Sequence, residues 1–188
     1  EITTYCAKIG IKYLTLYAFS TENWKRPKLE VEYLMKLLEK YLKEELEVYL
    51  ENNIRFRAIG DLSKFSKSLQ NRILKTQELT SSCNGLTQVL ALNYGSKDEI
   101  IRAIKKLNEK GLEVSEKNLE SCLDTAGISP VDIMIRTSGE VRLSNYLLWQ
   151  NAYAEMFFVQ TYWPDFTKTE LDDIISDFSR RERRFGAV

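Results

Sequence analysis

Segments typical of β-strands alternate with segments typical of α-helices along the chain, and this alternation limits the possible fold more than any other feature. Ile11–Phe19 and Leu86–Leu92 are dense in apolar side chains and predict buried strands. Between them, Pro27 opens a segment to about Asn53 in which apolar residues recur at spacings of three and four, which predicts an amphipathic helix. This alternation predicts an α/β fold with a mainly parallel central sheet flanked by helices.

The rest of the chain continues the pattern. The first residues are typical of the end of a helix, and further strands and helices are predicted, with two apolar stretches between the last strand and the last helix. The ranges are Glu1–Lys8 for the first helix, Ile54–Ile59 and Val131–Ile135 for strands, Leu62–Leu79, Ser96–Glu109, Ser115–Leu123 and Thr167–Arg183 for helices, and Tyr146–Trp149 and Met156–Val159 for the apolar stretches. With 8 glycines, 3 prolines and no linker or repeat, we expect one domain over residues 1–188.

Composition excludes several classes of function. Histidine is absent, which excludes histidine general bases, histidine-activated nucleophiles and histidine metal ligands. A metal would therefore need oxygen ligands, which favours a hard ion such as Mg²⁺. Lysine plus arginine and aspartate plus glutamate both number 27, and this zero net charge argues against a nucleic-acid-binding protein.

The cysteines and the hydropathy indicate where the protein works. Cys6, Cys83 and Cys122 are odd in number and widely spaced, which predicts free thiols rather than disulfides or a zinc site. No apolar run approaches the ~20 residues that span a bilayer, and no charged-then-apolar opening resembles a signal peptide. We expect a soluble, cytoplasmic protein whose surface can still touch a membrane.

Two polar segments follow predicted strands, and in parallel sheets ligands bind beyond the carboxyl ends of the strands. They are Ser20–Arg26 and Arg136–Ser144. Arg136 and Arg142 lie six residues apart across a glycine-containing loop, so both guanidinium groups can converge on one anion. Arginine offers paired donors that suit phosphate. Structural ion pairs with Glu140, Asp132 or Glu22 explain these arginines equally well on the residues alone.

Three features near the carboxyl end also carry charge. Glu155 is a lone carboxylate in an apolar, aromatic stretch, and burying it requires a cation or a donor. A Mg²⁺ ligand is one solution and an ion pair to a helix is the commoner one. The segment Trp163–Phe166 is typical of a turn before a helix. Arg180–Arg184 is typical of a solvated helix end, with donation to an acidic ligand or a partner subunit as the alternative.

Four contiguous motifs stand in order along the chain, with two shorter ones between them. They are AFSTENWKRP at 18–27, IRTSGEVRLSNYLLWQNAYAE at 135–155, WPDF at 163–166 and RERRFG at 181–186, with GD at 60–61 and NYG at 93–95. Together they resemble the cis-prenyltransferase family, and within it the bacterial undecaprenyl diphosphate synthases, also called isoprenyl transferases. The resemblance runs over essentially the whole chain.

The resemblance implies a Mg²⁺-dependent transferase that adds isopentenyl diphosphate units to an allylic diphosphate such as farnesyl diphosphate. The new double bonds are cis, and the long polyprenyl diphosphate product is the precursor of the cell-wall lipid carrier. It also implies a homodimer in which the Arg181–Gly186 end reaches toward the partner's site, and peripheral membrane contact through the product.

By motif position, the resemblance also assigns residues. Arg136, Arg142, Leu143 and Ser144 would bind isopentenyl diphosphate, and Glu155 would help to hold Mg²⁺. The substrate region would be lined by Ser20, Thr21, Glu22, Trp24 and Arg26. Asn23 stands where the family's proton acceptor is usually assigned. Because a neutral amide is a very weak base, we expect Asn23 to orient a substrate or a diphosphate oxygen that takes the proton.

One part of the family pattern lies outside this sequence. The family begins with a strand and an Asp-Gly-Asn-Gly-Arg-Trp loop that supplies a metal-binding Asp, whereas Glu1 falls inside the helix that follows. A chain of these residues alone is expected to be close to inactive. The alternative function is a non-catalytic family member that stabilises a catalytic subunit. Degenerate diphosphate-site residues would be expected of it, yet the residues assigned to that site are present.

Overall fold

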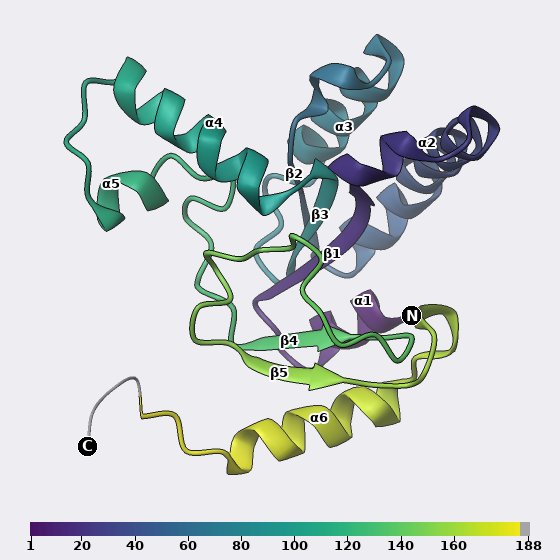
Figure 1. Ribbon diagram of the computed structural model, residues 1–188. Coiled ribbons are helices and arrows are strands. Elements are labelled where there is room, and N and C mark those ends of the chain that lie inside the picture. Colours follow the sequence, from purple (N-terminus) through teal and green to yellow (C-terminus); the bar gives the residue numbers. More distant parts are fainter. Residues whose placement is uncertain (185–188) are drawn as a thin grey trace. The chain divides into compact units, whose positions relative to one another are not determined.

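Within the part of the chain that the structure describes, the strands pair in parallel and the fold is α/β, in agreement with the predicted α/β fold and mainly parallel strands. The computed structural model describes residues 1–184. By its contacts the chain divides into two units, one over Thr3–Ile128 and one from Ser129 onward, which are described in turn. Each unit has its own sheet (Figure 1).

The first unit holds a three-stranded sheet in the order β1-β3-β2, with helices before, between and after its strands. The elements are α1 (Ile2–Lys8), β1 (Tyr13–Ser20), the 3-10 helix η1 (Thr21–Lys25), α2 (Lys28–Glu51), β2 (Arg55–Ile59), the 3-10 helix η2 (Leu62–Lys64), α3 (Lys67–Leu79), β3 (Thr87–Tyr94), α4 (Ser96–Glu109) and α5 (Glu116–Glu120).

Strand β3 lies at the centre of this sheet because its residues suit burial on both faces. Its residues from Gln88 to Tyr94 are all buried, which is typical of an inner parallel strand. The register with β1 places Ser20 opposite Tyr94. The polar segment after β1 therefore begins beside the carboxyl end of β3.

Helices α2 and α3 lie side by side and both contact β2 (Figure 1). Helix α2 begins directly after Pro27 and buries a stripe that includes Val31, Leu38 and Leu42, which confirms the predicted amphipathic helix. The prediction of one helix over Leu62–Leu79 is wrong in one respect, because α3 begins only at Lys67. The Ser66 hydroxyl caps it by accepting a hydrogen bond from the backbone N–H of Leu69.

The second unit holds β4 (Ile133–Arg136), β5 (Glu155–Phe158), the 3-10 helix η3 (Trp163–Asp165) and α6 (Lys168–Arg180). Thr167 caps α6 and forms a capping box with Glu170, so the chain turns into this helix where the sequence indicates. The apolar stretch Tyr146–Trp149 lies in turns between the two strands. Among the described residues, no helix combines the length and the apolar character that crossing a membrane requires.

Candidate functional site

The segment that follows β1 folds into the short 3-10 helix η1, and Asn23 closes it at both ends. The backbone N–H of Ser20 donates to Asn23 Oδ1 at 2.8 Å, and the backbone N–H of Arg26 donates to the Asn23 carbonyl at 3.0 Å. The side-chain oxygen of Asn23 is thus engaged in holding the turn. The contacts of the Asn23 side-chain oxygen are therefore with the backbone of its own turn.

Trp24 is the best-fixed side chain of η1. Its Nε1–H donates to Asn93 Oδ1 at 2.7 Å, and its ring lies edge-on to Phe19 with the ring centroids 5.1 Å apart. Phe65 lies 6.0 Å from it on the same measure. The indole is therefore held by aromatic contacts and by one hydrogen bond from a different strand.

The remaining predicted residues of this segment are more accessible. Arg26 pairs with Glu30 in the first turn of α2 at 2.7 Å, and both side chains are about half exposed. The Thr21 hydroxyl donates to Glu22 Oε2 at 3.1 Å. The structure thus gathers the six predicted residues on one turn at the end of β1, in which Glu22 and Arg26 are exposed and Trp24 is held in place.

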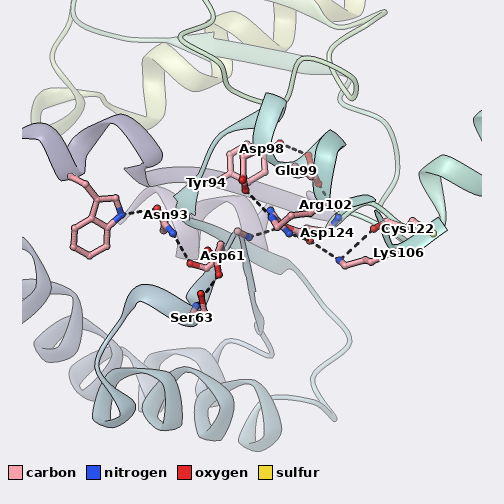
Figure 2. Close-up of polar contacts among 12 residues, drawn as sticks. Asp61, Ser63, Asn93, Tyr94, Asp98, Glu99, Arg102, Lys106, Cys122 and Asp124 are labelled. Carbon is pink, nitrogen blue, oxygen red and sulfur yellow. Dashed lines mark hydrogen bonds and ion pairs between the residues drawn. The ribbon is translucent and has the colours of Figure 1, made fainter. Parts of the chain in front are cut away.

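A buried charge network lies beyond the carboxyl end of β2 (Figure 2). The Arg102 guanidinium donates to both carboxylate oxygens of Asp124, at 2.8 and 2.6 Å, and Lys106 Nζ lies 3.2 Å from Asp124 Oδ1. Asp124 Oδ2 also accepts the backbone N–H of Gly60 at 3.0 Å. Burial by itself raises the pKa of Asp124, but the hydrogen bonds from Arg102 and the nearby positive charges outweigh it and leave that pKa below its usual value.

Sequence reasoning did not identify this network. Asp98, Arg102 and Lys106 recur every four residues on α4, which marks one helix face. Glu99, on the neighbouring face, is fully buried and accepts hydrogen bonds from the Tyr94 hydroxyl at 2.5 Å and from the Asp124 N–H at 2.9 Å. The four-residue spacing was the available signal, whereas the partner Asp124 is distant in sequence.

The second polar segment belongs to the second unit and begins with Arg136, the last residue of β4. Arg136 is half-buried and has no ion-pair partner within residues 1–184. Arg142 forms an exposed ion pair with Glu140, one of the pairings left open by the sequence. Asp132 pairs instead with Arg183, at 2.6 Å. Arg136 is thus the arginine of this segment whose charge no described carboxylate neutralises.

The loop between β4 and β5 has an unusual backbone. Ser138, Ser144, Asn145 and Leu147 all have positive φ angles, between 46° and 70°. Each such angle costs a non-glycine residue roughly 1 kcal/mol, and strained backbone of this kind clusters at functional sites. Gly139, in the same loop, also has a positive φ angle, +69°, and a Cβ there would lie 2.6 Å from Gln160 Oε1. The strain supports a binding role for this loop.

Glu155, the expected metal ligand, is held by Arg181. Arg181 Nη1 donates to Glu155 Oε2 at 2.7 Å, its guanidinium lies 4.2 Å from the centroid of the Phe157 ring, and Nη2 reaches Asp177 at 2.9 Å. The structure thus realises the ion-pair alternative for Glu155. The sequence alone predicts a solvated helix end that includes Arg181, and the four-residue spacing from Asp177 is the one local signal of the pairing seen here.

The described residues do not supply a full set of metal ligands. Within residues 1–184, no three side chains of the acidic, cysteine or histidine types gather as a group that could hold an ion. The register sets Glu155 opposite Ile133 and Arg136 opposite Phe158, so Glu155 and Arg136 lie at opposite ends of the strand pair, about 10 Å apart along it. One carboxylate fits a Mg²⁺ that takes its other ligands from substrate phosphates and water, not a protein-built cage.

A cavity of about 550 Å³ lies beside β2, away from the segment after β1. It is lined by Arg55, Arg57 and Lys106 among others, but Arg57 donates to the carbonyls of Asp124 and Ala126 and so closes a loop. Burial lowers the pKa of Arg57. Arg55 and Arg57 already donate to backbone carbonyls and Lys106 already pairs with Asp124, so we assign this cavity no substrate.

The Arg181–Gly186 end is expected to reach toward a partner subunit, and part of it lies among the described residues. Arg181 pairs with Glu155 and Arg183 with Asp132, whereas Phe185 and Gly186 lie outside the described residues.

Comparison with known proteins agrees with the motifs. The family model described as "Putative undecaprenyl diphosphate synthase" matches residues 1–186. Isoprenyl transferases of Wolinella succinogenes and Helicobacter pylori are 63% and 56% identical to this chain, over all of it and over 82% and 83% of their own lengths.

Two solved structures share the fold. A probable undecaprenyl diphosphate synthase from Campylobacter jejuni has a TM-score of 0.93 at 46% identity, covering 98% of this chain and 88% of its own. Lavandulyl diphosphate synthase from Lavandula x intermedia, solved in complex with dimethylallyl diphosphate, has a TM-score of 0.92 at 34% identity, covering 98% and 83%. The chain therefore belongs to the undecaprenyl diphosphate synthase family of isoprenyl transferases.

Proposed function

We propose that this protein condenses isopentenyl diphosphate units onto an allylic diphosphate, farnesyl diphosphate, with cis double bonds. The product would be a long-chain polyprenyl diphosphate, the precursor of the cell-wall lipid carrier. Family membership supports the reaction class, and the fold it shares with an enzyme solved with dimethylallyl diphosphate supports an allylic substrate. The observation that carries the proposal is Arg136, a half-buried cation at a strand end with no described carboxylate partner.

In this proposal the loop after β4 binds isopentenyl diphosphate. Arg136 supplies a charge that no carboxylate of residues 1–184 neutralises, and Arg142 exchanges its exposed contact with Glu140 for the more highly charged diphosphate. Ser144 contributes a hydroxyl, with Leu143 beside it. Hydrogen bonds to charged groups are worth about 1.5–3 kcal/mol each, so three of them hold the substrate firmly.

The turn Ser20–Arg26 lines the region of the allylic substrate in the same proposal. Asn23 orients groups there, since its side-chain oxygen accepts the Ser20 N–H. An exposed apolar stripe on α2 supports a path for the growing chain, because Leu29, Tyr33 and Leu37 recur every four residues and face outward. Each CH₂ group buried against such a surface contributes about 0.8 kcal/mol.

We propose Mg²⁺ as the metal, with Glu155 as one ligand. When bound, the ion would offset the negative charge that develops on the leaving diphosphate. Arg181 donates a hydrogen bond to one carboxylate oxygen of Glu155, so Arg181 must share that oxygen with the metal or release it when the metal binds. Three further predictions stay untested: homodimer formation, contact with a membrane through the product, and a cytoplasmic location. The three free, buried cysteines are consistent with a cytoplasmic location.

The first prediction tests the isopentenyl diphosphate site. Full-length enzyme is assayed with Mg²⁺, farnesyl diphosphate and labelled isopentenyl diphosphate, and long-chain product is expected. Arg136→Ala should raise the KM for isopentenyl diphosphate roughly 10- to 100-fold, because one charge-assisted contact is lost. Arg142→Ala should act in the same direction.

The control is Arg180→Ala, which removes an exposed arginine that lies 3.5 Å from Asp177 and should leave KM unchanged. Unaltered kinetics in both loop variants would refute the assigned site. Full-length protein that forms no product alone but stimulates a second prenyltransferase would identify the non-catalytic subunit instead.

A further inference from the structure

Asn93, near the carboxyl end of β3, is a buried polar residue whose role the motifs do not explain. Its side chain is 1% exposed. Its φ angle is +46°, in the left-handed region that asparagine tolerates better than most residues. A buried amide must find hydrogen-bond partners, so those of Asn93 indicate why it is there.

Both ends of the Asn93 amide are used, and they connect two different loops (Figure 2). Oδ1 accepts the indole N–H of Trp24 at 2.7 Å. Nδ2 donates to the Asp61 carbonyl at 2.7 Å, in the turn after β2. The Asn93 backbone carbonyl also accepts the Asp61 N–H, at 3.3 Å. One residue of the central strand thus joins the turns that follow both of its neighbours.

The hydrogen bond between Asn93 and Trp24 fixes the orientation of the indole ring, which the aromatic contacts alone leave undetermined. Edge-on packing against Phe19 and the contact with Phe65 restrict where the ring lies. A single directed N–H bond decides which edge of the indole faces β3. Trp24 is the fourth of the 5 residues of η1 and follows Asn23, so its orientation is coupled to that of the turn.

We propose that Asn93 is a positioning residue, which sets the orientation of Trp24 and through it the Thr21–Lys25 turn. The effect on substrate binding rests on the proposed function, whereas the effect on Trp24 does not. Asparagine suits this position because it offers an acceptor and a donor together. Aspartate would keep the acceptor but face the Asp61 carbonyl without a donor, and glycine would keep the backbone conformation with neither group.

The test observes Trp24 directly. In a nitrogen–proton NMR spectrum, Trp24→Phe identifies the Trp24 indole N–H signal by its loss, and the same substitution at Trp149 and at Trp163 identifies theirs. Asn93→Gly should shift that signal and speed its exchange with water roughly fivefold or more, since its acceptor is gone. The signals of Trp149 and Trp163, in the second unit, should stay in place and report that the fold is intact.

The matched control is Asn53→Gly in the turn before β2. Asn53 also has a positive φ, +53°, and its side chain bonds to Asn84, so the same substitution is made in the same backbone conformation away from Trp24. It should leave the Trp24 signal unchanged. Asn93→Asp should retain the signal nearer its original position than Asn93→Gly does, because the acceptor remains.

Kinetics of the full-length enzyme complete the test. Asn93→Gly and Trp24→Phe should raise the KM for the allylic diphosphate by similar factors, and the double variant should be no worse than the more affected single one. Additive effects, or an unmoved Trp24 signal in Asn93→Gly, would overturn the proposal. Expected NMR changes in a protein that condenses no substrate would refute the proposed function while leaving the Asn93–Trp24 coupling established.

Discussion

At the scale of single residues, the charge that matters most for stability is Asp124. It is the shared acceptor of Arg102, Lys106 and the Gly60 N–H, and its side chain is only 11% exposed. Removing this charge leaves the mostly buried Arg102 guanidinium with only the half-exposed Asp98 as counter-charge, and an incompletely paired buried charge is costly. Lys106 is 45% exposed, so water can solvate it and its share of the loss is smaller.

We therefore expect Asp124→Asn to lower the free energy of unfolding at pH 7 by about 2–3 kcal/mol, measured by urea denaturation. The pKa of Asp124 is lowered in the folded state, so its stabilisation is present above the unfolded-state pKa near 4 and is lost as pH falls through the folded-state pKa. The gap between the two proteins should thus narrow below about pH 4.

Asp98→Asn is the matched control, because Asp98 binds the same Arg102 at 2.7 Å but is 44% exposed. Its cost should stay under about 1 kcal/mol. An Asp124→Asn protein as stable as the Asp98→Asn protein would show that the cluster does not stabilise the fold.

Single residues also mark the limit of prediction from sequence. Arg136, Arg142 and Ser144 were selectable because a motif and a strand end coincide there. Asn93 and Asp124 were not, because each acts through partners far along the chain, 69 residues away for Trp24 and 64 for Gly60. A buried polar contact depends on which strand ends meet, and this is not a local property.

At the scale of elements, β2 shows how an outer strand is closed. The backbone N–H groups that face away from β3 all donate to side chains: Phe56 to Thr80, Ala58 to Gln77 and Gly60 to Asp124, at 2.7 to 3.0 Å. An outer strand with free N–H groups would invite pairing with another chain. Side chains from the end of helix α3 and from Asp124 therefore satisfy the outward-facing N–H groups of β2 and of Gly60, in place of a further strand.

Gly60, just after β2, gives the element-scale prediction. Its φ is +109°, and a Cβ would lie 2.0 Å from the Leu92 carbonyl oxygen on β3. Gly60→Ala must displace backbone at the end of the sheet, and we expect a loss of about 3 kcal/mol in unfolding free energy.

Gly10 provides the comparison, since its φ is +83° but nothing lies within 4 Å of a Cβ there. Gly10→Ala should cost about 1 kcal/mol, the conformational penalty alone. Equal losses in the two variants, by thermal or urea unfolding, would show that close approach to Leu92 is not what requires glycine at position 60.

Helix boundaries show why elements are easier to predict than their ends. The stripe on α2 and the start of the last helix at Thr167 are predicted from local patterns, and both are confirmed. The break between η2 and α3 was not predicted, because the apolar spacing runs on through Phe65, which the fold buries in an extended conformation. Burial of one side chain there outweighs helix continuity.

At the scale of the whole molecule, we expect the proposed metal to be required for product formation but not for folding. Chelation with EDTA should reduce product formation by full-length enzyme more than about 100-fold, and added Mg²⁺ should restore it. The unfolding temperature should change by less than about 2 °C, because residues 1–184 contain no cluster that a structural metal would fill. Turnover that persists in EDTA would contradict the proposed metal, and a large drop in unfolding temperature would reveal a structural ion.

The sequence by itself determined the α/β class, the parallel strands and the family, because periodicity and contiguous motifs are local signals. Only the tertiary structure decided that Glu155 is held by Arg181, that Arg136 lacks a described carboxylate partner and that Asn93 anchors Trp24. Strand register brings such groups together, as when Ser20 comes to lie opposite Tyr94. That register depends on burial summed over the whole sheet, so no single segment encodes it.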